Sequence, residues 1–118
     1  MADVTVWFNP RCSKCRTAQG ILEERGVEAD YVRYLDSAPT RAELERVLGM
    51  LGTDDPTAIA RRGEDRWKEL GLDGKPRDEV LDAMAANPIL IERPIVIRGE
   101  RAVVARPPEK VLELLDQS

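Results

Sequence analysis

Residues 4–15 read Val4-Thr5-Val6-Trp7-Phe8-Asn9-Pro10-Arg11-Cys12-Ser13-Lys14-Cys15. Apolar residues alternate over 4–8, which predicts a strand, and the apolar spacing after Cys12 predicts a helix over 13–25. Cys12 and Cys15 are the only cysteines of the chain, and they fall where the strand passes into the helix. A helix N-terminus carries unpaired N–H groups and partial positive charge, which stabilise a thiolate on Cys12. The stretch therefore predicts redox or thiol-transfer chemistry.

Composition limits the other classes of function. The 118 residues suit a single domain, and 42% apolar with 34% charged residues is ordinary for a globular protein. The net charge of −4 argues against a nucleic-acid surface, and no apolar run approaches the roughly 20 residues of a membrane helix. The chain has no histidine, so we expect no metal site at the two thiols. The start shows no signal-peptide pattern, which favours the cytoplasm, where a cysteine pair is catalytic more often than structural.

The rest of the chain predicts one α/β domain. A β-rich segment at 30–34 follows the first helix and is expected to pair in parallel with strand 4–8. Two apolar runs at 95–97 and 102–105, separated by Arg98-Gly99-Glu100, predict an antiparallel hairpin, and Pro107-Pro108 opens a last helix. Between these parts the sequence predicts only helices, at 40–51, 55–61, 65–70 and 77–86. We therefore expect a thioredoxin-like core in the order βαβ…ββα, with a helical insertion of about 38–88 in a single domain of residues 1–118.

Several motifs are shared with a known family. They are Asn9-Pro10-Arg11-Cys12-Ser13-Lys14-Cys15-Arg16, Tyr34-Leu35, Pro39-Thr40-Arg41, Glu43-Leu44, Glu69-Leu70-Gly71-Leu72 and Asn87-Pro88-Ile89-Leu90-Ile91-Glu92-Arg93-Pro94-Ile95-Val96. Together they resemble the glutaredoxin-linked arsenate reductases of the thioredoxin fold. The resemblance covers nearly the whole chain, and its most specific part is the last motif.

This resemblance implies a reaction and a set of site residues. Cys12 matches the family's nucleophile, and Arg61, Arg93 and Arg106 match three arginines that hold the arsenic oxyanion. Pro94 matches a proline that opens a strand beside the thiol, so the Arg93–Pro94 bond is expected to be cis. The implied reaction reduces arsenate to arsenite with no bound cofactor. The electrons come from an external thiol reductant, which is glutathione, glutaredoxin or an equivalent.

Two departures from the family pattern affect the expected mechanism. Phe8 stands where members often carry histidine, so we expect arginines both to bind the oxyanion and to stabilise the thiolate. Lowering a thiol pKa from about 8.5 to about 6 takes roughly 3.4 kcal/mol, whereas a helix terminus supplies at most about 2 kcal/mol. Cys15 stands where many members carry serine, so the Cys12 adduct is resolved either by Cys15 or by an external thiol. A third alternative is that Cys15 is only a small buried apolar residue. Arg16 is expected to support the site by making its electrostatic potential more positive.

Two other functions also fit the pattern. Spx-like regulators resemble it as a sister group, which would mean binding to RNA polymerase and a switch through a Cys12–Cys15 disulfide. A general glutaredoxin-like oxidoreductase is the other alternative. Arg106 favours the reductase, because the regulators lack an arginine before the last helix. The expected partners are arsenate or a similar oxyanion and a glutaredoxin- or thioredoxin-like reductant, with no nucleic acid and no membrane, and the protein is expected to be a monomer.

Overall fold

The structure is a computed structural model and describes residues 4–115. These residues group into two compact units, one formed by the chain up to Tyr34 and from Arg93 onward, the other by Leu35–Glu92. The predicted helical insertion of about 38–88 falls within the second range. Over residues 4–115, no helix combines the length and the apolar character that crossing a membrane requires.

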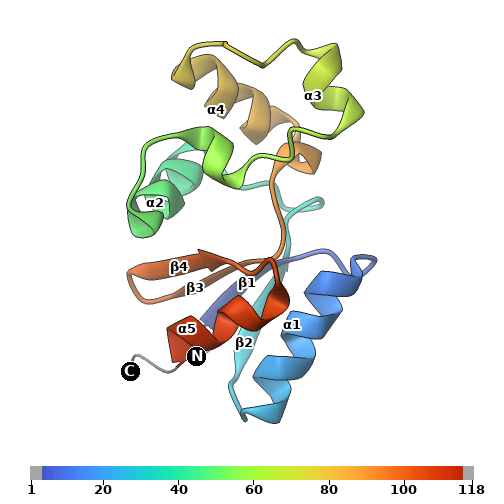
Figure 1. Cartoon of the computed structure of the whole chain (residues 1–118), viewed down its shortest axis with the longest axis vertical. Coiled ribbons are helices and arrows are strands. Elements are labelled where there is room, and N and C mark those ends of the chain that lie inside the picture. Colours follow the sequence, from blue (N-terminus) through green and yellow to red (C-terminus); the bar gives the residue numbers. More distant parts are fainter. Residues whose placement is uncertain (1–3, 116–118) are drawn as a thin grey trace. The chain divides into compact units, whose positions relative to one another are not determined.

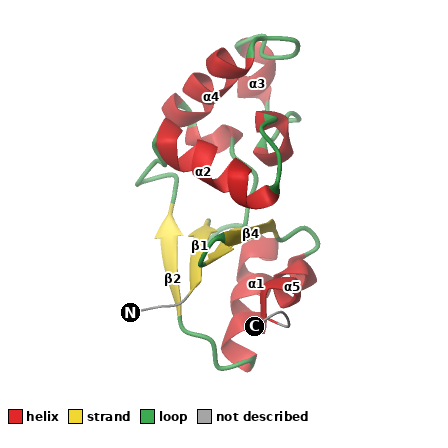
Figure 2. Ribbon diagram, turned by 90° about the vertical axis from the view of Figure 1, so that its left-hand side faces the viewer, coloured by secondary structure: helices red, strands yellow, loops and turns green. Residues whose placement is uncertain are grey.

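The first unit is a four-stranded mixed sheet with helices beside it. Its strands follow the order β2-β1-β3-β4, with β1 parallel to β2 and β3 antiparallel to both β1 and β4. Helices α1 and α5 lie side by side along one face of this sheet (Figure 1, Figure 2). The bounds are β1 Val4–Phe8, α1 Ser13–Glu24, β2 Ala29–Arg33, β3 Ile95–Arg98, β4 Arg101–Val104 and α5 Leu112–Leu115. The predicted thioredoxin-like α/β core is confirmed.

The buried residues of β1 and α1 show how the strand and the helix on either side of the cysteine loop are anchored in the core. β1 is a central strand, and its residues are buried on both faces, with only Thr5 partly exposed. Helix α1 turns Cys15, Ala18 and Leu22 into the core, at spacings of three and four residues that fall on one face. The helix ends where Gly26 adopts a φ of 68°, a left-handed conformation that favours glycine. Cys15 and Leu22 of α1 thereby share one apolar cluster with Val4, Val6 and Phe8 of β1.

The second unit consists of helical segments. A capping box starts α2, in which the Glu43 N–H donates to the Thr40 hydroxyl and the Thr40 N–H donates to the Glu43 carboxylate. Arg41 at the start of α2 makes ion pairs with Asp78 and Asp82 of α4, which tie these two helices together. The bounds are α2 Arg41–Leu51, η1 Pro56–Ile59, α3 Asp65–Glu69, α4 Arg77–Ala86 and η2 Pro88–Leu90.

Three local details differ from the sequence prediction. The segment at 55–61 forms a short 3₁₀ helix that stops at Ile59, because Ala60 turns extended and pairs with Ile91. The hairpin turn is shorter than predicted, since Arg98 pairs with Arg101 and remains in the strand. The last helix begins as a 3₁₀ segment, η3 Pro108–Val111, before α5 takes over.

Candidate active site

Cys12 lies at the end of the loop that joins β1 to α1, immediately before the first residue of the helix. Asn9 organises this loop, because its side-chain oxygen accepts a hydrogen bond of 3.0 Å from the Arg11 N–H. The Asn9 carbonyl accepts another of 3.0 Å from the Cys12 N–H. Sequence reasoning assigned no role to Asn9, although an Asn-Pro pair before a helix is a known turn signal.

The Cys12 thiolate is stabilised by the first turn of α1. Burial alone would raise the pKa of Cys12, but the N–H groups of Cys15 and Lys14, the Cys15 thiol and the positive charge of Arg93 outweigh it. The pKa of Cys12 is therefore lowered. The two N–H groups face the sulfur without the geometry of a formal capping hydrogen bond, so their effect is that of a helix N-terminus on a nearby anion.

The pKa of Cys15 is shifted in the opposite direction from that of Cys12. Its side chain has no exposed surface, and burial raises the pKa of the Cys15 thiol to about 11, with further contributions from the negative charge and acceptor sulfur of Cys12. The backbone of Asn9 and the charge of Arg93 act in the other direction. The pair therefore consists of a partly exposed cysteine with a lowered pKa at Cys12 and a buried cysteine with a raised pKa at Cys15.

Arg93 carries unused donors close to these sulfur atoms. Its charge lowers the pKa of both cysteines, which places the guanidinium within electrostatic reach of them. The Nε and Nη1 atoms of Arg93 are buried and have no hydrogen-bond partner among residues 4–115. Because a buried charged donor without an acceptor is costly, this arrangement is suited to an anion that supplies acceptors from outside the chain.

Arg106 holds the backbone that carries Arg93. Its Nη1 atom donates a hydrogen bond of 2.9 Å to the Arg93 carbonyl. Pro94 follows Arg93 through a cis peptide bond, as predicted, and the Arg106–Pro107 bond is also cis, which was not predicted. Sequence reasoning identified Arg106 only as an oxyanion ligand, so its contact with the Arg93 backbone is an additional finding.

The remaining predicted residues lie in different surroundings. Arg16 is exposed on α1, one residue beyond Cys15. Arg61 belongs to the unit of residues 35–92, where its Nη1 lies 2.6 Å from the Glu64 carboxylate and its Nε 3.8 Å from the Glu92 carboxylate. Its predicted contact with the oxyanion stays a prediction, and an incoming anion would compete with these carboxylates.

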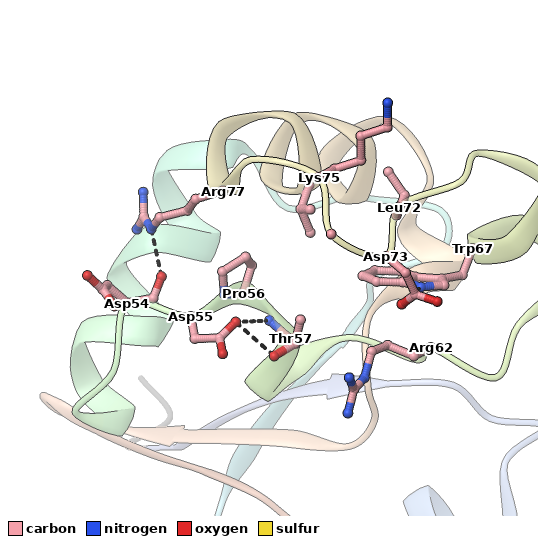
Figure 3. A pocket seen from close by; sticks show the side chains of 12 residues that line it. Asp54, Asp55, Pro56, Thr57, Arg62, Trp67, Leu72, Asp73, Lys75 and Arg77 are labelled. Carbon is pink, nitrogen blue, oxygen red and sulfur yellow. Dashed lines mark hydrogen bonds between the residues drawn. The ribbon is translucent and has the colours of Figure 1, made fainter.

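A pocket of about 330 Å³ lies in the helical unit (Figure 3). Its polar groups largely satisfy one another, because Asp55 accepts from the backbone and hydroxyl of Thr57, and the buried Trp67 indole donates to Asp73 over 2.9 Å. The side chain of Trp67 is 1% exposed, so it packs in the core of the helical unit. The charged lining residues are three acidic and three basic ones, namely Asp54, Asp55, Asp73, Arg62, Lys75 and Arg77. No cysteine lines this pocket, which leaves the β1–α1 junction as the candidate active site.

The unequal thiols predict unequal alkylation. We expect iodoacetamide to modify Cys12 at pH values below 9, because its pKa is lowered and the thiolate is the reactive form. Cys15 should stay unmodified until the pH approaches about 11, where its thiolate begins to form. Mass spectrometry of the digested protein across a pH series measures both rates. In guanidinium chloride the two cysteines should react alike, and a faster reaction at Cys15 in the folded protein would contradict the assignment.

The fold and the site together define a class of protein. A strand of a mixed sheet followed by a helix with a partly exposed, acidified cysteine at its N-terminus is typical of thiol-active proteins of the thioredoxin-like class. The model of the ArsC family matches residues 7–114. The chain belongs to the ArsC family.

Known proteins agree with this membership along the whole chain. An arsenate reductase of Neisseria meningitidis is 42% identical over 117 residues, covering 98% of this chain and all of the relative. An arsenate reductase of Haemophilus influenzae is 38% identical, covering 95% of this chain and 98% of the relative. The solved structure of an arsenate reductase from Vibrio cholerae matches with a TM-score of 0.91 and 39% identity, covering 95% of this chain and 97% of the other.

Proposed function

We propose that this chain reduces arsenate to arsenite, with Cys12 as the nucleophile. The observation that carries this is the lowered pKa of Cys12 beside an Arg93 guanidinium whose buried Nε and Nη1 atoms have no partner among the described residues. The names of the similar proteins support the choice of arsenate among oxyanions.

In the first step the Cys12 thiolate attacks the arsenic of a bound arsenate. A sulfur–arsenic bond forms, and one arsenate oxygen leaves as water after taking up a proton from solvent. Arg93 binds the oxyanion through its fork of donors, which suits a tetrahedral anion better than the point charge of a lysine does. Arg106 holds Arg93 in place through its backbone carbonyl, and we assign direct oxyanion contacts to Arg106 and Arg61 by family membership.

In the second step a thiol attacks the Cys12 sulfur, so that a disulfide forms and the thiol proton passes to the departing arsenite. The electron pair of the sulfur–arsenic bond moves to arsenic, which is reduced from arsenic(V) to arsenic(III) and leaves as arsenite. An external thiol reductant supplies the two electrons for each turnover, and the reaction requires no bound cofactor.

Arsenite production by the purified protein tests this function. The reduced protein is mixed with arsenate in three parallel reactions containing glutathione with glutaredoxin, thioredoxin with its reductase, or dithiothreitol. Arsenite is separated by chromatography and quantified. We expect arsenite that increases with protein concentration, and we expect phosphate to compete, since it has the same shape and charge. No arsenite above the protein-free rate with any of the three reductants would overturn the proposed function.

A further inference from the structure

Cys15 is placed to reach the same sulfur that holds the substrate. It follows Cys12 by three residues at the start of α1, and residues three apart on a helix lie on the same face. Cys12 packs against the apolar cluster that contains Cys15, and the Cys15 side chain helps to lower the pKa of Cys12, so the two side chains are neighbours. Cys12 is partly exposed whereas Cys15 has no exposed surface, so the thiol approaches Cys12 from its core side.

Simple space filling does not explain this arrangement. Cys15 does pack within an apolar cluster that includes Val6, Phe8 and Leu22. An apolar side chain of similar size would fill the same volume, but it would not donate to the Cys12 sulfur. The buried thiol is therefore also a group whose protonation depends on the chemical state of Cys12.

We infer that Cys15 is the resolving thiol, which attacks the Cys12 sulfur in the arsenic adduct and releases arsenite with formation of a Cys12–Cys15 disulfide. This role rests on the proposed arsenate reduction. The sulfur–arsenic bond breaks and its electron pair passes to arsenic, while the bond between the two sulfur atoms forms. The proton of Cys15 and one further proton from solvent end on the arsenite oxygens. Arsenic gains two electrons, and the two cysteines together lose two.

The chemical state of Cys12 explains why Cys15 acts only after substrate has bound. In the free protein the Cys12 thiolate helps to hold the Cys15 proton, both by its negative charge and as a hydrogen-bond acceptor. Once the Cys12 sulfur is bonded to arsenic it is no longer a thiolate acceptor for the Cys15 proton, and the negative charge lies instead on the arsenic oxygens, where Arg93 binds it. Burial still opposes ionisation of Cys15, but the Asn9 backbone and Arg93 continue to favour it. Adduct formation at Cys12 thus removes the acceptor of the Cys15 proton and turns the Cys12 sulfur from a nucleophile into a group that a thiol can attack.

A Cys12–Cys15 disulfide also favours one class of external reductant. A dithiol protein of the thioredoxin class supplies two electrons and two protons from one partner, and it leaves as a disulfide. Its first thiolate is expected to attack Cys12, because that sulfur is the exposed one. Added thiol is then not needed for release of arsenite, whereas an external thiol such as glutathione is required if resolution is external.

A single-turnover experiment without any added thiol tests this role. The fully reduced protein is freed of reductant under argon and mixed with excess arsenate. For wild type we expect one arsenite and the loss of two free thiols per chain. Trypsin cleaves after Lys14, so the disulfide is detected directly as residues 12–14 linked to residues 15–16. Cys15→Ala should release no arsenite until glutathione is added, and it should then release it. Ser13→Ala, which changes an exposed residue between the two cysteines, should behave like wild type.

The outcomes separate this inference from the proposed function. If wild type forms the arsenic adduct but releases arsenite only after glutathione is added, Cys15 is not the resolving thiol and arsenate reduction at Cys12 still stands. If wild type forms neither adduct nor arsenite under any condition, the proposed function fails as well. Circular dichroism verifies that Cys15→Ala is folded. The disulfide mapping uses wild type alone, so it decides the question even if that variant unfolds.

Discussion

Replacing Cys12 with serine is expected to lower the rate of arsenate reduction by at least about a thousandfold, the scale on which removal of a catalytic nucleophile acts. The expected loss of rate comes from removing the thiolate nucleophile, because the substitution hardly changes the shape of the site. A serine hydroxyl keeps nearly the same volume at the N-terminus of α1, but it is hardly ionised at neutral pH and attacks arsenic poorly. Arsenite release at saturating arsenate and reductant measures the effect.

Two controls make the Cys12→Ser result specific. Ser13→Ala alters the neighbouring exposed position and should leave the rate within about twofold of wild type, because surface substitutions away from a site have small effects. Arsenate should still bind to Cys12→Ser, since Arg93 is unchanged, and a shift of the thermal unfolding midpoint by arsenate or phosphate would detect it. If Cys12→Ser kept its activity while Cys15→Ser lost it, Cys15 would be the nucleophile and the assignment would be reversed.

The sequence sufficed to predict the β1–α1 junction because each of its parts has a local cause. Alternation over Val4–Phe8 set the strand, and the periodic apolar residues after Cys12 set the helix. Gly26 ended that helix through a backbone conformation that other residues rarely adopt. Since these causes act within a few residues, they needed no knowledge of the tertiary structure.

The interior of the site could not be predicted in the same way. Cys15 was left as either a resolving thiol or a small buried apolar residue, because a pattern of residues does not reveal how deeply one side chain is buried. The contact from Arg106 to the Arg93 carbonyl joins residues 13 positions apart and exists only once the β3–β4 hairpin has formed. Arg61 was selected by motif, and the motif gave no sign of its ion pairs with Glu64 and Glu92.

Replacing Arg93 is expected to have the second largest effect, and two substitutions separate its two roles. Arg93→Ala removes both the positive charge and the donors, so kcat/KM for arsenate should fall by about a hundred- to a thousandfold, as when an oxyanion donor is removed. The pKa of Cys12 should rise, because the guanidinium helps to lower it. The acidic limb of the pH–rate profile, which follows formation of the thiolate, should move to higher pH.

Arg93→Lys keeps a positive charge near the sulfur but loses the planar fork of donors. We therefore expect the pH dependence of Cys12 alkylation to stay close to wild type, while kcat/KM for arsenate still falls by about ten- to a hundredfold. Arg33→Lys, an exposed arginine at the end of β2, is the matched control and should change neither quantity. If Arg93→Lys and Arg93→Ala were both as active as wild type, the buried Nε and Nη1 atoms would not bind the substrate. The oxyanion would then have to be held by other groups, and Arg106 and Arg61 would be the next residues to replace.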